Sequence, residues 1–223
     1  MGPVSGSKET IGELTYRRIR GDILFGRLAP GQKLKLERMK DAYGTSVSTL
    51  RELLTRLSSE GLTIAEGLRG FHVAPVSQTD LREVAAMRLL LECHALEASL
   101  QNGELEWEGR VVAAHHKLSL LEKRMADGDK SQTELWKHYD REFHHALISA
   151  CDSTALLETH ASIYDKYLRY QMVSGIFRGD VAVGEHRKLL QAALTRDWPT
   201  AHDVLVRHVE DCVEDTLAAG RAL

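Results

Sequence analysis

Residues 44–61 read GTSVSTLRELLTRLSSEG and predict an amphipathic helix bounded by two glycines. Thr45 and Ser46 supply hydroxyl groups suited to an N-cap, and Gly61 marks the end of the helix. Apolar residues recur at the spacing of one helix face, at Leu50, Leu53, Leu54 and Leu57. This stretch is therefore expected to bury one side and to follow a tight turn.

The elements on either side of this helix complete a small fold. One helix is predicted over Thr10–Phe25 and a shorter one over Leu36–Tyr43, for which Gly44 is a left-handed C-cap. Two extended runs, over residues 62–66 and 71–74, flank a glycine-rich turn over residues 67–70 and predict a β-hairpin. Helix, helix, turn, helix and hairpin is the order of a winged helix-turn-helix.

We assign residues 10–75 to this winged helix-turn-helix and residues 1–9 to a disordered tail. A recognition helix docks in DNA by its first residues, where short hydroxyls suit phosphates and an arginine suits a phosphate or a guanine edge. The predicted DNA contacts are Ser46, Ser48, Thr49 and Arg51 of the helix, with Arg69 and Gly70 of the hairpin. The alternative, a surface helix with ordinary caps, explains any one of these residues but not the order of the elements.

The rest of the chain is predicted to be helical. Residues 76–80 are expected to be a linker, in which Ser77 and Asp80 give a capping-box pattern for the next helix. Six amphipathic segments without strand signals follow, at about 81–100, 104–126, 132–150, 154–173, 181–196 and 199–219. Residues 81–223 are therefore expected to form an antiparallel bundle of about six helices, and the chain is mainly α.

Charge and cysteine usage narrow the class of protein. Residues 1–75 hold 12 Lys and Arg against 8 Asp and Glu, although the whole chain has a formal net charge of −3. A basic N-terminal part joined to an acidic body favours a nucleic-acid contact at one end only. The three cysteines lack a C-x-x-C pairing, and we find no long apolar run and no signal peptide. We therefore expect a cytoplasmic protein without a membrane partner.

Four metal-capable side chains fall on the apolar faces of three predicted helices. Asp140 and His144 are four residues apart and lie one turn above each other, while His186 and His208 align with apolar neighbours on two later helices. Burying these groups is costly unless they are bonded or coordinated, and one shared ion would satisfy all four. The set predicts one divalent metal per chain, zinc first, with nickel or manganese as alternatives. Each histidine taken singly can also be a hydrogen-bonded core residue.

Two sets of motifs carry a family resemblance over about residues 10–217. The first resembles the winged-helix domain of the GntR superfamily of bacterial transcription regulators, through Pro30-Gly31, Tyr43-Gly44-Thr-Ser46, Leu50-Arg51-Glu52, Glu60-Gly61-Leu62 and Arg69-Gly70. The second is similar to the ligand-sensing FCD domain of the FadR-like branch, through Met87-Arg88, Leu91-Glu92, Asp140-Arg-Glu-Phe143-His144, Glu185-His186 and His208. The resemblance implies a homodimer on a palindromic operator in duplex DNA. It also implies a divalent metal and a small carboxylic acid effector bound at that metal.

The chain departs from the family pattern in its DNA-binding part. Val47 stands where relatives usually carry an arginine between the Ser and Thr of the recognition helix. Valine cannot donate a hydrogen bond to guanine but can contact a thymine methyl group, so we expect a different operator sequence. The short helix that starts at Leu36 also lacks a clear capping residue.

Arg88 and Glu92 are four residues apart on the inward side of the first bundle helix. One interpretation is an ion pair at a helix contact. The other is that Arg88 binds the carboxylate of the effector.

Three functions compete at this point. The first is a transcription regulator whose operator affinity is controlled by a small carboxylate at the metal. The second is a metal-dependent hydrolase with an N-terminal interaction module, which we disfavour because a non-ligand acid or base is needed. Glu142 points off the Asp140/His144 face, and Glu185 is only adjacent to a ligand. The third is a DNA-binding dimer with a purely structural metal site. We therefore predict no enzyme and no catalytic residue.

Overall fold

A computed structural model describes residues 10–176 and 178–219 of the chain. The chain divides into two compact units, Met1–Val76 and Ser77–Leu223, and each is described by itself. The tail predicted over residues 1–9 lies outside the described residues.

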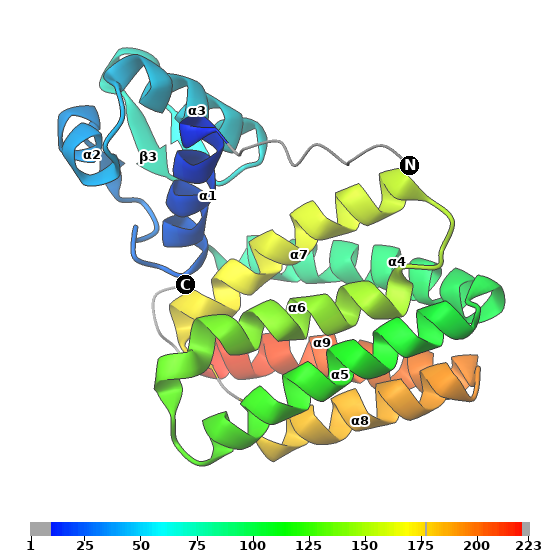
Figure 1. Cartoon of the computed structure of the whole chain (residues 1–223). Coiled ribbons are helices and arrows are strands. Elements are labelled where there is room, and N and C mark those ends of the chain that lie inside the picture. Colours follow the sequence, from blue (N-terminus) through cyan, green and yellow to red (C-terminus); the bar gives the residue numbers. More distant parts are fainter. Residues whose placement is uncertain (1–9, 177, 220–223) are drawn as a thin grey trace. The chain divides into compact units, whose positions relative to one another are not determined.

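The first unit contains three helices and a small sheet (Figure 1). Helix α1 spans Ile11–Leu24, α2 spans Leu36–Tyr43 and α3 spans Val47–Ser59. Gly44, at φ 64°, ends α2 in the left-handed conformation that the sequence predicts. The helices and the sheet share one apolar core, whose completely buried members include Ile19, Ile23, Leu50, Leu54 and Leu57.

Three short antiparallel strands form the sheet, in the order β1-β3-β2. The predicted hairpin is confirmed as β2 (Thr63–Ala65) and β3 (Phe71–Val73), joined by a short 3₁₀ turn over Gly67–Arg69. Strand β1 (Lys33–Leu34) pairs with the other side of β3. The sequence does not predict β1, because two residues are too few to show an alternating pattern.

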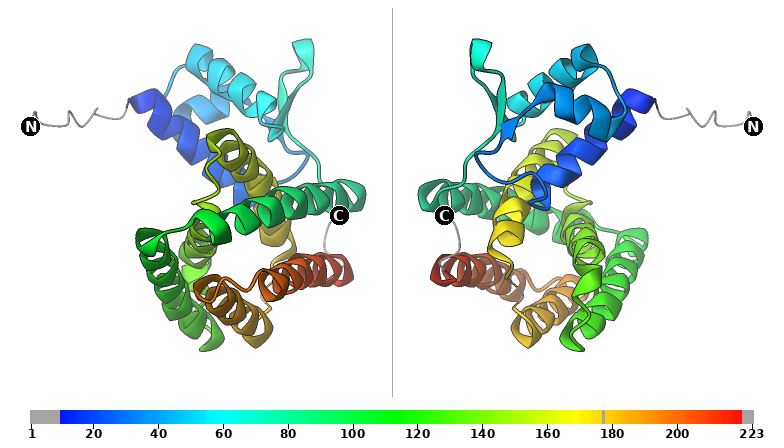
Figure 2. Two further views of the ribbon diagram at one scale, coloured as in Figure 1. Left: turned by 90° about the vertical axis from the view of Figure 1, so that its right-hand side faces the viewer. Right: turned by 90° about the vertical axis from the view of Figure 1, so that its left-hand side faces the viewer.

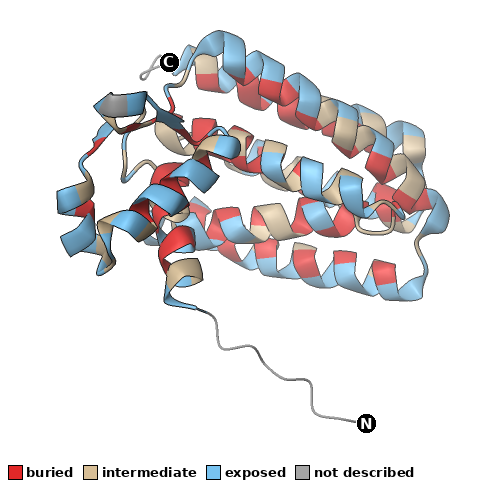
Figure 3. Ribbon diagram, turned by 90° about the horizontal axis from the view of Figure 1, so that it is seen from above, coloured by how far each residue is buried: buried red, intermediate tan, exposed pale blue. Residues whose placement is uncertain are grey.

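The second unit is the predicted antiparallel bundle of six helices, and consecutive helices run in opposite directions (Figure 1). They are α4 (Gln78–Asn102), α5 (Leu105–Ala126), α6 (Thr133–Ile148), α7 (Thr154–Ser174), α8 (Asp180–Leu194) and α9 (Trp198–Ala218). Two further views show these helices around a common interior (Figure 2). Buried residues run along the helices as stripes, opposite exposed residues on the outer faces (Figure 3). In the part of the chain that the structure describes, no helix has the length and apolar character to cross a membrane.

The predicted linker over residues 76–80 is too long. The Ser77 hydroxyl accepts a hydrogen bond from the Asp80 amide at 3.1 Å, so α4 already begins at Gln78. Tyr170 of α7 holds the same turn from the other side. Its hydroxyl donates to the Asp80 carboxylate and accepts from the Ser77 amide at 3.4 Å. The first turn of the bundle is therefore tied to α7.

Gly103 lies where α4 turns into α5, directly under the ring of Trp107. A Cβ atom at Gly103 would lie 2.5 Å from Trp107 Cε3 and 2.7 Å from the Ser99 carbonyl oxygen. Trp107 is buried and its indole nitrogen donates to the Ala146 carbonyl at 2.9 Å. The ring therefore cannot yield without breaking a buried hydrogen bond, and glycine is required by the close approach.

We expect Gly103→Ala to lower the free energy of unfolding by about 1–3 kcal/mol, the usual cost of overpacking a tight site. The matched control is Gly109→Ala on α5, where an added Cβ meets nothing within 4 Å. That change should raise stability by up to about 1 kcal/mol, because alanine favours a helix interior. Thermal unfolding measures both. Equal effects of the two substitutions would contradict the packing argument.

Candidate metal centre and nucleic-acid interface

The predicted DNA-binding hydroxyls gather at the start of α3. The Ser46 side chain accepts a hydrogen bond from the Thr49 amide at 3.1 Å and is the N-cap of the helix. Its oxygen also lies 2.8 Å from Ser48 Oγ and 2.9 Å from Thr49 Oγ1. Ser46 and Ser48 are exposed, and Thr49 is half-buried. Hydroxyls at a helix N-terminus, where amides also point outward, suit a phosphate.

The other predicted DNA contacts of the first unit also lie at its surface. Arg51 is exposed on α3, one turn beyond the cap, and Val47 is half-exposed beside it. Arg69 is exposed in the 3₁₀ turn between β2 and β3. Gly70 follows it at φ 92°, a conformation that favours glycine. These residues are free of core packing, as a binding surface requires.

Three of the four predicted metal ligands meet at the centre of the bundle. His144 (α6), His186 (α8) and His208 (α9) are buried, and each offers one ligand atom within 4.8 Å of the others. The fourth, Asp140, is buried one turn before His144, and its Oδ1 lies 3.3 Å from His186 Nε2. Tyr164 of α7 donates to Asp140 Oδ2 at 2.9 Å, and Lys137 Nζ lies 3.3 Å from the same oxygen. The structure thus brings the predicted set together.

A glutamate from another position binds the Nδ1 atom of each histidine. Nδ1 lies 2.5 Å from Glu92 Oε1 for His144, 2.6 Å from Glu122 Oε1 for His186, and 2.7 Å from Glu185 Oε2 for His208. Such carboxylates fix the ring orientation and the tautomer of metal-binding histidines. The opposite nitrogen, Nε2, is then left with a lone pair.

Two of these Nε2 atoms form no hydrogen bond among the described residues, although one of them, that of His186, lies 3.3 Å from Asp140 Oδ1. They belong to His144 and His186, and both are buried. An unsatisfied buried nitrogen is costly, and a divalent cation would satisfy it. Three imidazoles and one carboxylate are also the donor types that zinc prefers. The residues therefore fit a metal ion, which the sequence predicts here.

The ionisation states of these residues suit coordination. Burial lowers the pKa of His208 to about 3. Burial also lowers the pKa of His144, although the Glu92 carboxylate acts in the opposite direction. For Asp140, burial raises the pKa, but Lys137 and the surrounding histidines outweigh it and hold the pKa below its ordinary value. Neutral imidazoles and an ionised carboxylate are the forms that bind metals.

The sequence does not predict the three glutamates as partners of the ligands. Glu185 is interpreted there as merely adjacent to a ligand, yet its carboxylate binds His208. Glu122 carries a usable signal, because it follows the apolar face of Ala114 and Leu118 on α5 and is buried. Alignment with apolar neighbours marks Glu122 as inward-facing, just as it marks the histidines.

Arg88 forms the ion pair that was one of its two interpretations. Its Nε donates to Glu92 Oε2 at 2.8 Å, and both side chains are 1% exposed. The guanidinium carbon also lies 4.5 Å and 4.7 Å from the ring centroids of Tyr164 and Tyr167. A contact between Arg88 and an effector stays a prediction.

A narrow pocket opens beside the histidines, with about 20 Å³ of free space, room for about one water molecule. Its lining includes Asp140, His186 and His208 together with Lys137, Gln171 and Arg178. Lys137 and Arg178 are basic, and each is paired with a carboxylate, Lys137 with Asp140 at 3.3 Å and Arg178 with Glu185 at 2.8 Å.

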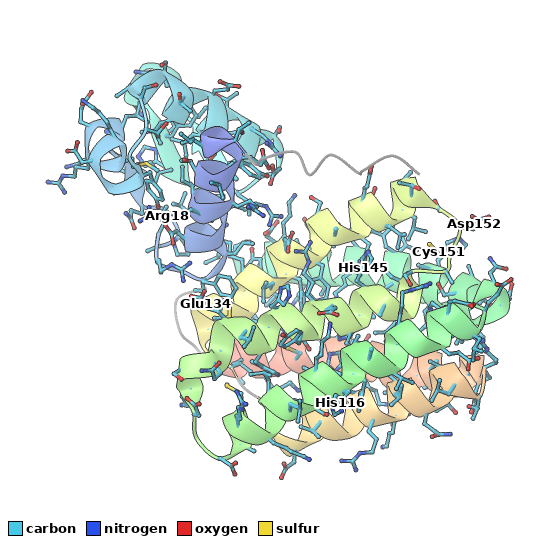
Figure 4. All side chains as sticks on the ribbon, viewed as in Figure 1. Arg18, His116, Glu134, His145, Cys151 and Asp152 are labelled. Carbon is cyan, nitrogen blue, oxygen red and sulfur yellow. The ribbon has the colours of Figure 1, made fainter. Side chains whose placement is uncertain are left out.

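Histidines outside the predicted set do not join it. His116 of α5 and His145 of α6 are exposed (Figure 4). His138 is exposed as well, while His115 is half-buried with its ring centroid 5.3 Å from that of Phe143. Glu142, discounted as a general base, is bound to Lys117 Nζ at 2.7 Å.

Two family models match this chain and divide it at the same place as the structure. The model for bacterial regulatory proteins of the gntR family matches residues 12–73. The FCD domain model matches residues 83–211, more than half of the chain.

Curated relatives agree over almost the full length. One is an uncharacterized HTH-type transcriptional regulator, BphR, from Paraburkholderia xenovorans (strain LB400). It is 38% identical over 213 residues, which cover 95% of this chain and 86% of the relative. Another is the HTH-type transcriptional repressor GlaR of Escherichia coli (strain K12), 28% identical over 87% of this chain and 90% of the relative.

Solved structures share the fold. E. coli McbR/YncC has a TM-score of 0.77 at 19% identity, over 95% of this chain and 99% of that chain. A putative GntR regulator from Rhodococcus sp. RHA1 has a TM-score of 0.76 at 23% identity, over 93% and 97% of the two chains. The chain therefore belongs to the GntR family of bacterial transcription regulators and joins that family's DNA-binding domain to an FCD domain.

Proposed function

We propose that a small carboxylic acid, bound at a divalent metal in the FCD domain, controls how tightly this regulator binds its operator. The observation that carries the proposal is the set of buried histidines whose Nδ1 atoms are taken by glutamates. One ligand atom from each ring lies within 4.8 Å of the others, and the Nε2 atoms of His144 and His186 form no hydrogen bond among the described residues. The relatives are transcription regulators, so the chain binds DNA and is not an enzyme.

Asp140, His144, His186 and His208 would hold the ion, for which zinc is our first choice and nickel or manganese the alternatives. Bound there, the metal would supply positive charge and open coordination positions for a carboxylate oxygen. One carboxylate and three neutral imidazoles leave a divalent ion with net positive charge. Lys137 and Arg178 add basic groups at the pocket. An anion is therefore the favoured ligand.

The pocket has free space for about one water molecule, so any acid requires its lining side chains to shift, and a short acid requires the smallest shift. Arg88, which is ion-paired with Glu92, is our proposed partner for a carboxylate of that acid. Because Arg88 does not line the pocket, this contact requires the side chains around His144 to shift. The remaining alternative is a metal that is purely structural. A measurement of effector binding distinguishes this alternative from a metal that anchors an effector.

In the first unit we propose that Ser46, Ser48 and Thr49 bind phosphates, together with the backbone at Gly70. We assign Arg51 to a guanine edge or a phosphate and Arg69 to a phosphate or the minor groove. Regulators of this family bind DNA and generally act as dimers. We propose a homodimer of this chain on a palindromic operator, which places one recognition helix in each half-site.

Purified protein that never met a chelator should hold about one divalent ion per chain by elemental analysis. We expect His186→Ala to lose that ion and to unfold at a lower temperature, because a bound ligand adds about 2.7 kcal/mol at 100 times its Kd. The matched control is His116→Ala, which removes an exposed histidine from the same domain. Wild-type protein without stoichiometric metal would refute the metal centre.

For the DNA contacts, we expect Arg51→Ala to weaken binding to an operator selected from random duplexes by roughly 5- to 150-fold, the range for 1–3 kcal/mol. The control Arg110→Ala removes one exposed positive charge from α5 and should leave affinity unchanged. Arg69→Ala should weaken binding and reduce the salt slope by about one. Fluorescence anisotropy at several salt concentrations measures all three. A footprint without inverted symmetry would argue against the dimer.

Effector control requires that the acid bind one DNA-binding state better than the other. We expect a coupling of about 1–3 kcal/mol, which changes operator affinity by roughly 5- to 150-fold, and operator DNA must change acid affinity by the same factor. Calorimetric titration of short carboxylic acids, with and without operator, measures both factors. Equal acid affinities in the two titrations would exclude the switch. Acid binding that is lost on chelation but kept in Arg88→Ala would keep the sensor and remove Arg88 from it.

A further inference from the structure

His160 of α7 is a buried histidine that the proposed function leaves without a role. It is 2% exposed, and its Nε2 lies 3.2 Å from Glu92 Oε2. Its Nδ1 finds no hydrogen-bond partner within residues 10–176 and 178–219. The ring is not one of the three that cluster around the candidate metal position. Among the described residues, the ring of His160 therefore makes its hydrogen bond with Glu92, the glutamate that binds the predicted ligand His144.

Glu92 receives three donors, and they divide between its two oxygens. Oε2 accepts from Arg88 Nε at 2.8 Å and from His160 Nε2 at 3.2 Å. Oε1 faces His144 Nδ1 at 2.5 Å. Two donors from different helices, α4 and α7, thus fix one oxygen of the carboxylate. The plane of the carboxylate, and with it the direction of Oε1, is set by that pair of contacts.

The ion pair of Glu92 with Arg88 makes this arrangement effective. The guanidinium nitrogen lies 2.8 Å from Oε2 and supplies the opposite charge that a buried carboxylate needs. An ionised carboxylate with one oxygen held in place accepts strongly from His144 Nδ1–H. Because the carboxylate can only accept, this bond places the proton on Nδ1, which then cannot also accept from Arg88 Nη2, 3.2 Å away. It leaves Nε2 with a lone pair.

From this geometry we infer that His160 is a positioning residue for the metal centre, acting through Glu92 on the ligand His144. Its Nε2–H holds Glu92 Oε2, so that Oε1 stays aligned with the ligand ring. Tyr164 lies one turn further along α7 and donates to Asp140 at 2.9 Å. Helix α7 supplies no ligand, yet it orients two of them. The inference rests on the proposed metal centre.

The test compares three variants of the full-length protein by zinc competition against a chromophoric chelator. His160→Leu keeps the volume and removes the donor, and we expect an affinity for zinc that is weaker by about 10-fold, the lower end of the range for losing a direct partner of a ligand. His160→Gln places an amide N–H near the position of Nε2, and it should restore affinity to within about threefold of wild type. The matched control, His145→Ala, removes an exposed histidine of α6 (Figure 4) and should leave affinity unchanged.

Cobalt substitution supplies a second measurement that a general loss of packing would not produce. We expect the visible d–d bands of Co²⁺ to shift in His160→Leu and to return in His160→Gln, because only the orientation of His144 differs. If His160→Leu fails to fold, His160→Asn keeps a polar side chain too short to place a donor at Nε2, and it should show the same loss.

Three outcomes separate a failure of the proposed metal centre from a failure of the proposed role of His160. Wild type that binds no zinc overturns the metal centre and this inference with it. Wild type that binds zinc, with His160→Leu or His160→Asn equal to it, overturns only the role of His160. The same holds if the Leu and Gln variants are equally weak, since the donor then does not matter.

Discussion

Burying charged and polar side chains among apolar helices is the constraint around which the FCD domain is organised. Every helix of the bundle sends at least one such group to the centre: Glu92 from α4, Glu122 from α5, Asp140 and His144 from α6, Tyr164 from α7, His186 from α8 and His208 from α9. A buried polar group left unpaired is more costly than the average hydrogen bond is favourable. The helices must therefore keep the relative positions that pair these groups. Apolar packing around them supplies most of the stability, while the polar centre specifies one arrangement.

Periodicity and capping residues predict most of the architecture. The six bundle helices, the N-caps at Ser46 and Ser77 and the C-cap at Gly44 all follow from local chemistry. Strand β1 does not, because its pairing with β3 is set by the tertiary fold rather than by its two residues. Predicted helix ends differ from the observed ones by up to three residues, the most at the start of α4.

In the candidate site, too, local sequence predicts some features, and the tertiary fold sets the others. Helical spacing places Asp140 and His144 on one face, and alignment with apolar neighbours marks His186 and His208 as inward-facing. The sequence cannot tell which residue of another helix meets each ring, because that depends on how the helices cross. The pairing of Glu122 with His186, across 64 positions, is therefore visible only in the structure. In the DNA-binding domain, the exposed hydroxyls at the start of α3 follow from the cap itself, so local sequence predicts them well.

Helix α7 connects the candidate metal centre to the first turn of α4 through two tyrosines, Tyr164 and Tyr170. Tyr164, which holds Asp140, and Tyr170, which holds Ser77 and Asp80, are six residues apart on one uninterrupted helix. At 1.5 Å per residue, they are separated by about 9 Å along the axis. A helix segment this short neither stretches nor bends appreciably under the forces of ligand binding. Asp140 and the residues where the chain enters the bundle are therefore connected through one short stretch of α7.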